Sequence, residues 1–278
     1  MDKLLILDGN SIINRAFYGV RLLTNAKGQH TNGVYGFLNI FLKILEEEDY
    51  KYAAVAFDLR APTFRHQMFD AYKAQRKGMP PELAEQMPYL KEILKLMGIP
   101  ILEKEGYEAD DIIGTVSALC EKENLNCVIL TGDRDDLQLA SDLTTVRLVV
   151  TKGGATETTD YSGETVAEKM GVSPAAFIDV KALMGDSSDN IPGVAGIGEK
   201  TAFSLIQEYN TLDNLYAHLD EIKGAKREKL EQGKDEAYMS KTLATIVRDV
   251  PLGIKATDLK KGEISEGKLY SYLSDLEL

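Results

Sequence analysis

Short, continuous apolar runs alternate with stretches of helical periodicity through the first half of the chain. The runs at 4–7, 53–57 and 127–130 each lead into aspartate, either at the next residue or within three residues. Runs of this kind are typical of strands that are buried on both faces of a parallel sheet. Ligands bind beyond the carboxyl ends of such strands, so we expect the aspartates to gather at one edge of the sheet.

The same pattern predicts an α/β fold in which a central, mainly parallel sheet is flanked by helices. Strands are expected at about 3–8, 53–58, 99–102, 127–130, 143–150 and 156–159. Helices are expected at about 9–18, 34–48, 82–97 and 108–121, with a loop at 24–33. The tripeptide Lys152-Gly153-Gly154 predicts a hairpin turn between the last two strands.

The character of the chain changes after about residue 162, where helices separated by glycine loops replace the strands. We therefore predict an α/β catalytic core at 1–162 and a helical subdomain at 163–278. Within the core, residues 60–77 carry five basic residues against one acidic residue, Asp70, and show no clean period. We expect a helical arch outside the core at about 60–81.

Composition excludes several classes of protein. A formal net charge of −12 over 278 residues argues against a nucleic-acid partner, unless the basic stretches at 60–77 and 223–229 define a local binding face. Cys120 and Cys127 have no cluster of metal ligands around them, so neither a zinc site nor a disulfide framework is expected. A reduced, cytoplasmic compartment fits this cysteine content. No apolar stretch approaches membrane-spanning length, and no membrane partner is expected.

Acidic residues form the main candidate site. They stand at strand ends, at the start of a helix and in a loop: Asp8, Asp58, Glu108, Asp110, Asp111, Asp133, Asp135, Asp186 and Asp189. Any one of them can instead cap a helix or close a turn. Together, carboxylates without histidine or cysteine favour hard cations, Mg²⁺ or Mn²⁺. Because the set exceeds the needs of one Mg²⁺, we expect two ions.

A glycine-rich segment follows closely behind the last acidic pair. Residues 191–202 place three glycines in a tight loop that leads into a helix. Such a loop presents backbone N–H groups to phosphate and is typical of a helix–hairpin–helix element, which binds nucleic-acid backbone without reading bases. An ordinary turn between two helices is the alternative. The predicted DNA-binding residues of this loop are Gly193, Val194, Gly196, Ile197, Gly198, Lys200 and Thr201.

Six motifs occur together in a specific order and spacing: 7–11, 56–58, 72–76, 108–111, 131–135 and 185–194. Through them, the whole chain resembles the flap endonuclease family, which includes the 5′-nuclease domain of bacterial DNA polymerase I. The resemblance implies a structure-specific 5′-nuclease, both flap endonuclease and 5′-3′ exonuclease, that hydrolyses DNA near 5′ single-strand/duplex junctions by a two-metal mechanism. It also implies a role in DNA replication and repair, fused to or acting with a DNA polymerase, and we expect a monomer.

The resemblance further assigns residue roles. One metal group would be Asp8, Asp58, Glu108 and Asp110, and the other Asp133, Asp135, Asp186 and Asp189, with Asp111 adjacent. Lys73 and Arg76 match basic residues of the family's helical gateway, and Tyr72 matches an aromatic that stacks on a displaced base. The catalytic residues would be Lys73, Arg76, Asp8, Asp58 and Asp133. The glycine loop is expected to hold K⁺ beside a phosphate.

Residue chemistry supports the role of the basic pair. If 72–76 is helical, Lys73 and Arg76 share one face and can neutralise charge that builds up on a phosphate. The alternative is a solvated basic helix without a catalytic part.

Two other functions compete with the nuclease. A phosphatase of the haloacid-dehalogenase type needs an aspartate two residues before its second one, and position 6 is Ile6. A DNA-binding module without catalysis would gain affinity by losing the carboxylates, so the complete acidic set argues against it.

Overall fold

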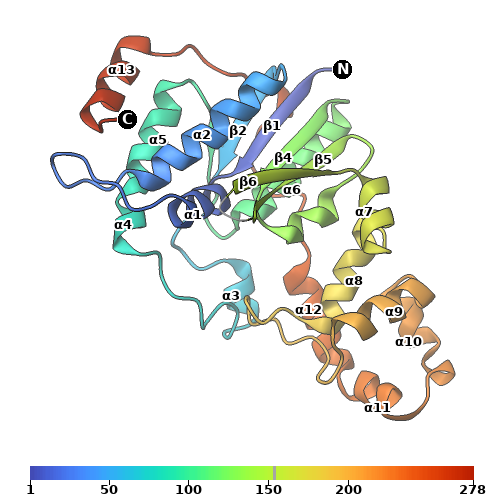
Figure 1. Ribbon diagram of the computed structural model, residues 1–278. Coiled ribbons are helices and arrows are strands. Elements are labelled where there is room, and N and C mark those ends of the chain that lie inside the picture. Colours follow the sequence, from blue (N-terminus) through green and yellow to red (C-terminus); the bar gives the residue numbers. More distant parts are fainter. Residues whose placement is uncertain (153–154) are drawn as a thin grey trace.

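The protein, described here by a computed structural model, is defined over residues 1–152 and 155–278 (Figure 1). Its centre is a six-stranded sheet in the order β3-β2-β1-β4-β5-β6. Neighbouring strands run parallel except β5 and β6, which are antiparallel. The strands are β1 (Lys3–Asp8), β2 (Tyr52–Ala56), β3 (Ile101–Leu102), β4 (Asn126–Thr131), β5 (Thr144–Lys152) and β6 (Ala155–Tyr161).

Helices cover both faces of the sheet. Leu5 and Leu7 of β1 belong to the core under α1 (Gly9–Gly19), α2 (Asn32–Glu47) and α5 (Gln86–Leu96). Leu4 and Ile6 belong to the core on the other side, under α6 (Ala109–Lys122). Because each strand is buried on both faces, it can be apolar at every position, which explains the continuous runs in the sequence.

The predicted strands and helices of this region are confirmed with small shifts of their ends. One predicted helix, at 82–97, is instead divided into α4 (Pro81–Ala84) and α5. Pro88 explains the break, because it has no N–H to donate to the Ala84 carbonyl and its ring crowds that carbonyl. The turn predicted at Lys152-Gly153-Gly154 falls partly on residues 153–154, which lie outside the described residues.

The basic stretch differs from its prediction. Its helix is confined to α3 (Phe64–Met68), and turns follow over 70–75. Lys73 has a φ of +56°, so it lies in the left-handed region and not on a continuous helix. The expectation that Lys73 and Arg76 share one helical face is therefore wrong. A turn brings them together instead, in which the Arg76 N–H donates to the Lys73 carbonyl at 3.1 Å.

A helical region follows the sheet and extends away from it (Figure 1). It contains α7 (Gly163–Met170), α8 (Pro174–Met184), α9 (Glu199–Tyr209), α10 (Leu212–Ala217), η2 (Leu219–Glu221), α11 (Gly224–Gln232) and α12 (Lys234–Ala244). Residues between Val172 and Ala237 form its own apolar core.

The last part of the chain returns to the sheet, with η3 (Ala256–Asp258) and α13 (Glu266–Asp275). Ile246 and Leu259 join the core beneath α6, and Leu276 joins the core on the opposite face. The sequence pattern predicts a helical subdomain over all of 163–278. In the structure, residues from Ile246 onward pack with the α/β region, because their apolar side chains complete its two cores.

Candidate metal centre and active site

Predicted acidic residues meet at the carboxyl ends of the central strands. Asp8 ends β1, Asp58 follows β2, Asp133 follows β4, and Asp110 lies in the first turn of α6. All four line a cavity of about 440 Å³. Parallel neighbouring strands bring their ends to one edge of the sheet, and this places residues from distant parts of the sequence in one cleft.

One set of carboxylates lies deep in this edge, and we call Asp8, Asp110 and Asp136 the deep group. One carboxylate oxygen from each residue lies within 4.8 Å of one from each of the other two. Burial, with help from neighbouring Asp58, raises the pKa of Asp8 to about 7. Burial and neighbouring carboxylates also raise the pKa values of Asp110 and Asp136 well above the usual range. The deep group therefore concentrates negative charge that is poorly solvated.

A second set lies nearer the surface, and we call Asp135, Asp186 and Asp189 the outer group. Here too, one oxygen from each residue lies within 4.8 Å of one from each of the other two. Lys181 Nζ lies 3.1 Å from Asp135 Oδ1 and 2.8 Å from Asp186 Oδ2, and Arg76 pairs with Asp189. Burial would raise the pKa of Asp186, but Lys181 and Ser188 lower it below its usual value. The outer group is thus compensated by cations of the chain itself.

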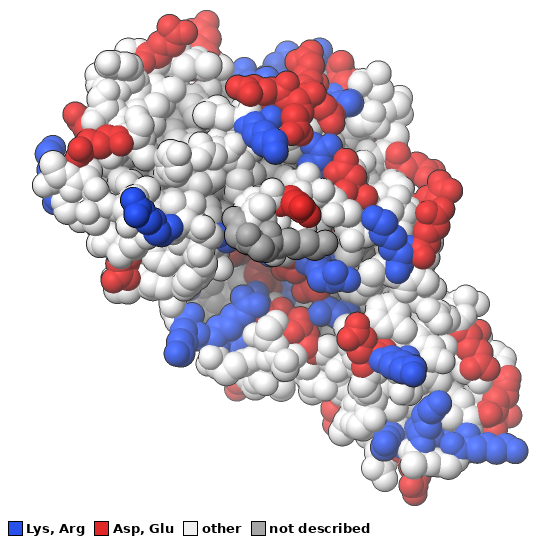
Figure 2. All heavy atoms as spheres, viewed as in Figure 1, with Lys and Arg blue, Asp and Glu red and all other residues white. Residues whose placement is uncertain are grey.

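The two groups face adjoining cavities. Asp133 and Arg76 line both the cavity of about 440 Å³ and a second one of about 710 Å³ that contains the outer group and Lys181. Figure 2 shows acidic atoms recessed in a hollow between the sheet and the helical region, with basic side chains beside them. The cleft therefore combines carboxylates in its floor with cations at its rim.

Asp111 is not available to a cation. It is fully buried, and its two oxygens lie 2.8 Å from Nη1 and Nη2 of Arg65. The same oxygens accept the backbone N–H groups of Glu108 at 3.0 Å and Val247 at 2.9 Å. We therefore correct the assignment of Asp111 to the metal ligands, because four donors already occupy its carboxylate.

Glu108 is also held by cations. Arg65 Nη1 lies 2.6 Å from its Oε2, and Lys73 pairs with its Oε1. Burial would raise the pKa of Glu108, but Lys73 and Arg65 hold it below the usual value. Asp58 lies nearby in a more exposed position, where its Oδ1 accepts the Ala109 N–H at 2.6 Å. Both predicted ligands are thus in the cleft, but each already has a partner.

Tyr72 does not offer a stacking surface in this conformation. Its side chain is 4% exposed, and its hydroxyl lies 3.1 Å from both oxygens of Glu108. The ring also meets His66 edge-on, with centroids 5.2 Å apart. The stacking role therefore stays a prediction, and it requires the buried ring to leave its site before a base could contact it.

Three residues in or beside the cleft are not predicted by the sequence pattern: Arg15, Asp136 and Lys181. Asp136 follows Asp133 by three residues in a short 3₁₀ helix, η1 (Arg134–Leu139), and this spacing was an available signal because such a helix has three residues per turn. Lys181 had the signal of a charge within an apolar helix, α8. Arg15 donates from Nη2 to the Gly132 carbonyl at 3.1 Å, a contact that only the fold creates.

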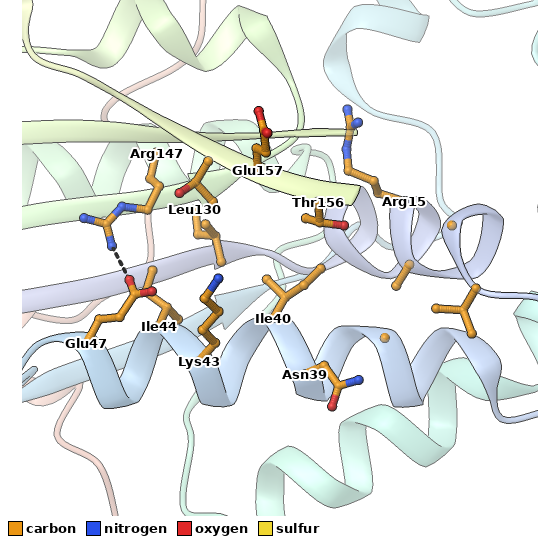
Figure 3. A pocket seen from close by; sticks show the side chains of 15 residues that line it. Arg15, Asn39, Ile40, Lys43, Ile44, Glu47, Leu130, Arg147, Thr156 and Glu157 are labelled. Carbon is orange, nitrogen blue, oxygen red and sulfur yellow. Dashed lines mark ion pairs between the residues drawn. The ribbon is translucent and has the colours of Figure 1, made fainter. Parts of the chain in front are cut away.

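Another cavity, of about 620 Å³, lies between α1, α2 and the β5–β6 pair (Figure 3). Its lining mixes apolar residues such as Ile40 with charged ones, and Arg147 Nη1 lies 3.8 Å from Glu47 Oε2. Arg15 lines both this cavity and the one around the outer group. Within the described residues, the carboxylate groups capable of holding a metal lie in the cleft and not here.

The glycine loop forms the hairpin between α8 and α9. Gly193 and Gly196 have φ values of +63° and +83°, which glycine adopts without strain. A Cβ on Gly193 would lie 2.4 Å from the Gly185 nitrogen, so this position requires glycine and ties the loop to the segment that carries the outer group.

The predicted DNA-binding residues of the loop differ in their exposure to solvent. Gly196, Gly198 and Lys200 are exposed, and Thr201 is half-buried. Gly193 is buried, and Val194 and Ile197 pack into the helical core, so these side chains do not reach a ligand. Lys229 of α11 lies over Gly196, which adds a cation to the exposed part of the loop.

Comparison with known families agrees with both halves of this structure. The N-terminal resolvase-like domain of 5′-3′ exonucleases matches residues 3–171, and their C-terminal SAM fold matches residues 172–267. The chain belongs to the 5′-3′ exonuclease family.

The curated relatives of this chain are longer proteins. DNA polymerase I of Caldicellulosiruptor bescii is 50% identical over 275 residues, which cover 99% of this chain and 32% of that protein. DNA polymerase I of Bacillus subtilis is 46% identical over 275 residues, covering 99% and 31%. The chain spans about a third of the length of these relatives.

A solved structure shares the fold of the exonuclease. The flap endonuclease of bacteriophage T5, in a pseudo-enzyme-product complex with DNA and metal ions, aligns with a TM-score of 0.70 and 22% identity. The alignment covers 99% of this chain and 100% of that one. It confirms the predicted sheet with its flanking helices and the C-terminal helical region.

The residues of the exonuclease fit a divalent cation. Asp110 Oδ1 and both oxygens of Asp136 are buried and find no hydrogen-bond partner in the described part of the chain, as expected of metal ligands. Oxygen donors without histidine or cysteine are typical of sites for hard cations. Among the described residues, no helix is both long and apolar enough to span a membrane.

Proposed function

We propose that this exonuclease is a structure-specific 5′-nuclease that hydrolyses phosphodiester bonds near 5′ single-strand/duplex junctions of DNA, and cuts flaps as well as 5′ ends. The observation that carries this proposal is the pairing of two carboxylate groups in one cleft, with Asp133 lining both of their cavities. Two Mg²⁺ or Mn²⁺ ions held there would polarise the phosphate and lower the pKa of the attacking water.

The side chains of the chain hold the ions and the substrate in this scheme. Asp8 and Asp110 would bind one cation, and the outer group the other, with Asp58, Glu108 and Asp133 at the cleft around them. Lys73 and Arg76 are now paired with Glu108 and Asp189. With those carboxylates bound to metal ions, both side chains would be free to neutralise charge on the phosphate in the transition state.

The helical region would hold the duplex. The N-terminus of α9 presents unpaired N–H groups behind the exposed Gly198, and Lys200 and Lys229 add positive charge close by. We place K⁺ at this loop, beside a phosphate. The basic stretch at 60–77, which carries Lys73 and Arg76, lies over the carboxylates and would guide the single strand.

The cellular setting of the enzyme is part of the same proposal. We place this monomer in the cytoplasm, where it serves replication and repair beside or fused to a DNA polymerase. The buried free cysteines, Cys120 and Cys127, fit a reducing compartment.

Digestion of a 5′-labelled flap in Mg²⁺, with the products sized, tests the proposed function. We expect cleavage next to the junction, and a loss of about 10³-fold or more with Asp133→Asn, because this carboxylate lines both cavities. Asp142→Asn, at an exposed aspartate just before β5 and away from the cleft, should cleave like the unchanged chain.

The outcomes separate the rival functions. Flap binding without cleavage in Mg²⁺ would indicate a binding module. Turnover of a small phosphomonoester without flap cleavage would indicate a phosphatase. Undiminished cleavage by Asp133→Asn would overturn the assigned site.

A further inference from the structure

Asp136 differs from the other buried carboxylates of the cleft. It is fully buried, and neither of its oxygens accepts a hydrogen bond from any of the described residues. By contrast, Arg65 holds Asp111, and Arg76 holds Asp189. A buried carboxylate without a partner is costly, so its retention in the fold requires either a proton or a cation that the described residues do not supply.

The geometry places Asp136 beside two carboxylates that line the cleft. The Asp133 side chain accepts the Asp135 N–H at 2.9 Å and so begins η1, which carries Asp136 one turn later. One oxygen of Asp136 then lies within 4.8 Å of one oxygen each of Asp8 and Asp110, both of which line the cavity of about 440 Å³. Ligands of one Mg²⁺ lie at most about 4.2 Å apart, twice the metal–oxygen distance, so a small contraction suffices to enclose an ion.

The other candidates for this site are less available than Asp136. Glu108 is neutralised by Arg65 and Lys73, and Asp58 accepts the Ala109 N–H. The six motifs include Glu108 and Asp58 but not Asp136, which directly follows the motif at 131–135.

We propose that Asp136 is a direct ligand of a divalent cation bound by the deep group, with Asp8 and Asp110 as its other protein ligands. The inference rests on the proposed two-metal cleft, and it identifies a ligand that the motifs did not contain. The cation supplies the positive charge that these three carboxylates lack. The alternative is a proton shared between Asp110 and Asp136 with no ion at that position.

Mn²⁺ titration of the full chain without DNA, followed by electron paramagnetic resonance, tests the inference. Asp136→Asn keeps the size of the side chain and should weaken binding at one site by about 10–100-fold or more. Asp8→Asn should weaken the same site, whereas Asp142→Asn, which changes an exposed aspartate, should leave both sites unchanged. Unchanged number and affinity of Mn²⁺ sites in Asp136→Asn, with Asp8→Asn impaired, would overturn the proposal.

Thermal unfolding gives an independent measure on the same variants. In EDTA, Asp136→Asn should unfold at a higher temperature than the unchanged chain, since a buried uncompensated carboxylate has been removed. Added Mn²⁺ should then raise the melting temperature of this variant less than that of the unchanged chain. An equal rise in both would contradict direct ligation.

A crystal structure of the unchanged chain grown with Mn²⁺ tests the same ligand without the use of a variant. Anomalous density at coordination distance from Asp136 supports the proposal, and an ion bound by Asp8 and Asp110 with Asp136 unligated overturns it. These measurements concern binding alone. An Mn²⁺ ion on Asp136 in a protein that cuts no flap would refute the proposed function and keep the site.

Discussion

The deep and outer groups are alike in composition and opposite in charge balance. Each brings three aspartates together within 4.8 Å. Lys181 and Arg76 pair with members of the outer group, whereas Asp110 Oδ1 and both oxygens of Asp136 have no hydrogen-bond partner among the described residues. The difference shows that clusters of carboxylates can differ in their demand for metal. A group without internal cations needs a proton or a cation from solution, whereas the outer group would have to release the cations of the chain before it could bind one.

The origin of the two groups explains this difference. The deep group is formed by a strand end, a helix start and η1, which are packed tightly around the sheet. The outer group combines η1 with the loop after α8, and that helix carries Lys181 in its last turn. The outer group thus lies where the two regions of the molecule meet, and cations from the loop at 72–76 reach it.

The largest expected effect comes from removing the internal cation of a compensated cluster. Arg65→Met should lower the free energy of unfolding by about 3–5 kcal/mol, because Asp111 and Glu108 would remain buried without their positive partner. Chemical denaturation measures the loss. Arg60→Met, at an exposed arginine, is the control and should change stability little.

A double variant sharpens this prediction. Arg65→Met with Asp111→Leu should recover part of the stability, since both charges are then gone. Failure to recover any stability would mean that Arg65 acts through packing and not through charge.

The next effect is the pH dependence of stability without metal. The pKa values of Asp8 and Asp135, raised by burial and neighbouring carboxylates to about 7 and about 6, lie above those of the unfolded chain. The folded state therefore binds more protons, and the free energy of unfolding should fall by a few kcal/mol as pH rises from about 4 to about 7.

Melting temperatures in EDTA at about pH 5 and about pH 8 measure this slope. The melting temperature of Asp8→Asn should fall less steeply with pH than that of the unchanged chain, because one group with a raised pKa has been removed. Saturating Mg²⁺ should flatten the slope of the unchanged chain, since ligation favours the ionised carboxylates. Equal slopes for Asp8→Asn and the unchanged chain in EDTA would show that Asp8 is not the titrating group.

The smallest effect concerns competition in the outer group. Lys181→Met should strengthen Mn²⁺ binding there about tenfold, or ~1.4 kcal/mol, because Lys181 no longer occupies Asp135 and Asp186. Mn²⁺ titration measures it, and Lys226→Met, at an exposed lysine of α11, should bind as before. Weaker binding in Lys181→Met would instead make Lys181 a residue that positions the ligands.

Local patterns predicted much of the site. Apolar runs that end in aspartate brought Asp8, Asp58 and Asp133 to one edge, because parallel strands always place their carboxyl ends together. Glycines at 193 and 196 predicted a tight loop, and both have positive φ values in the structure. These features depend on neighbouring residues and on backbone sterics, which are visible along the chain.

Other features depend on contacts between distant segments. Arg65 and Asp111 stand 46 positions apart, and no local rule pairs them. Tyr72 matched a stacking position by motif, yet packing against Glu108 and His66 buried it. Lys73 lies in a turn and not in the predicted helix, because the Asp189 carbonyl accepts its N–H at 2.8 Å and stabilises that turn.

The order of apolar and polar residues thus specified a buried parallel sheet, the edge at which its acidic residues collect, and a tight glycine loop beyond it. Which of those carboxylates pair with a cation of the protein, and which remain without one, was settled by folding alone. Burial and charge pairing arise between side chains that are brought together in space, and the electrostatic cost of an unpaired carboxylate exists only after water has been excluded around it.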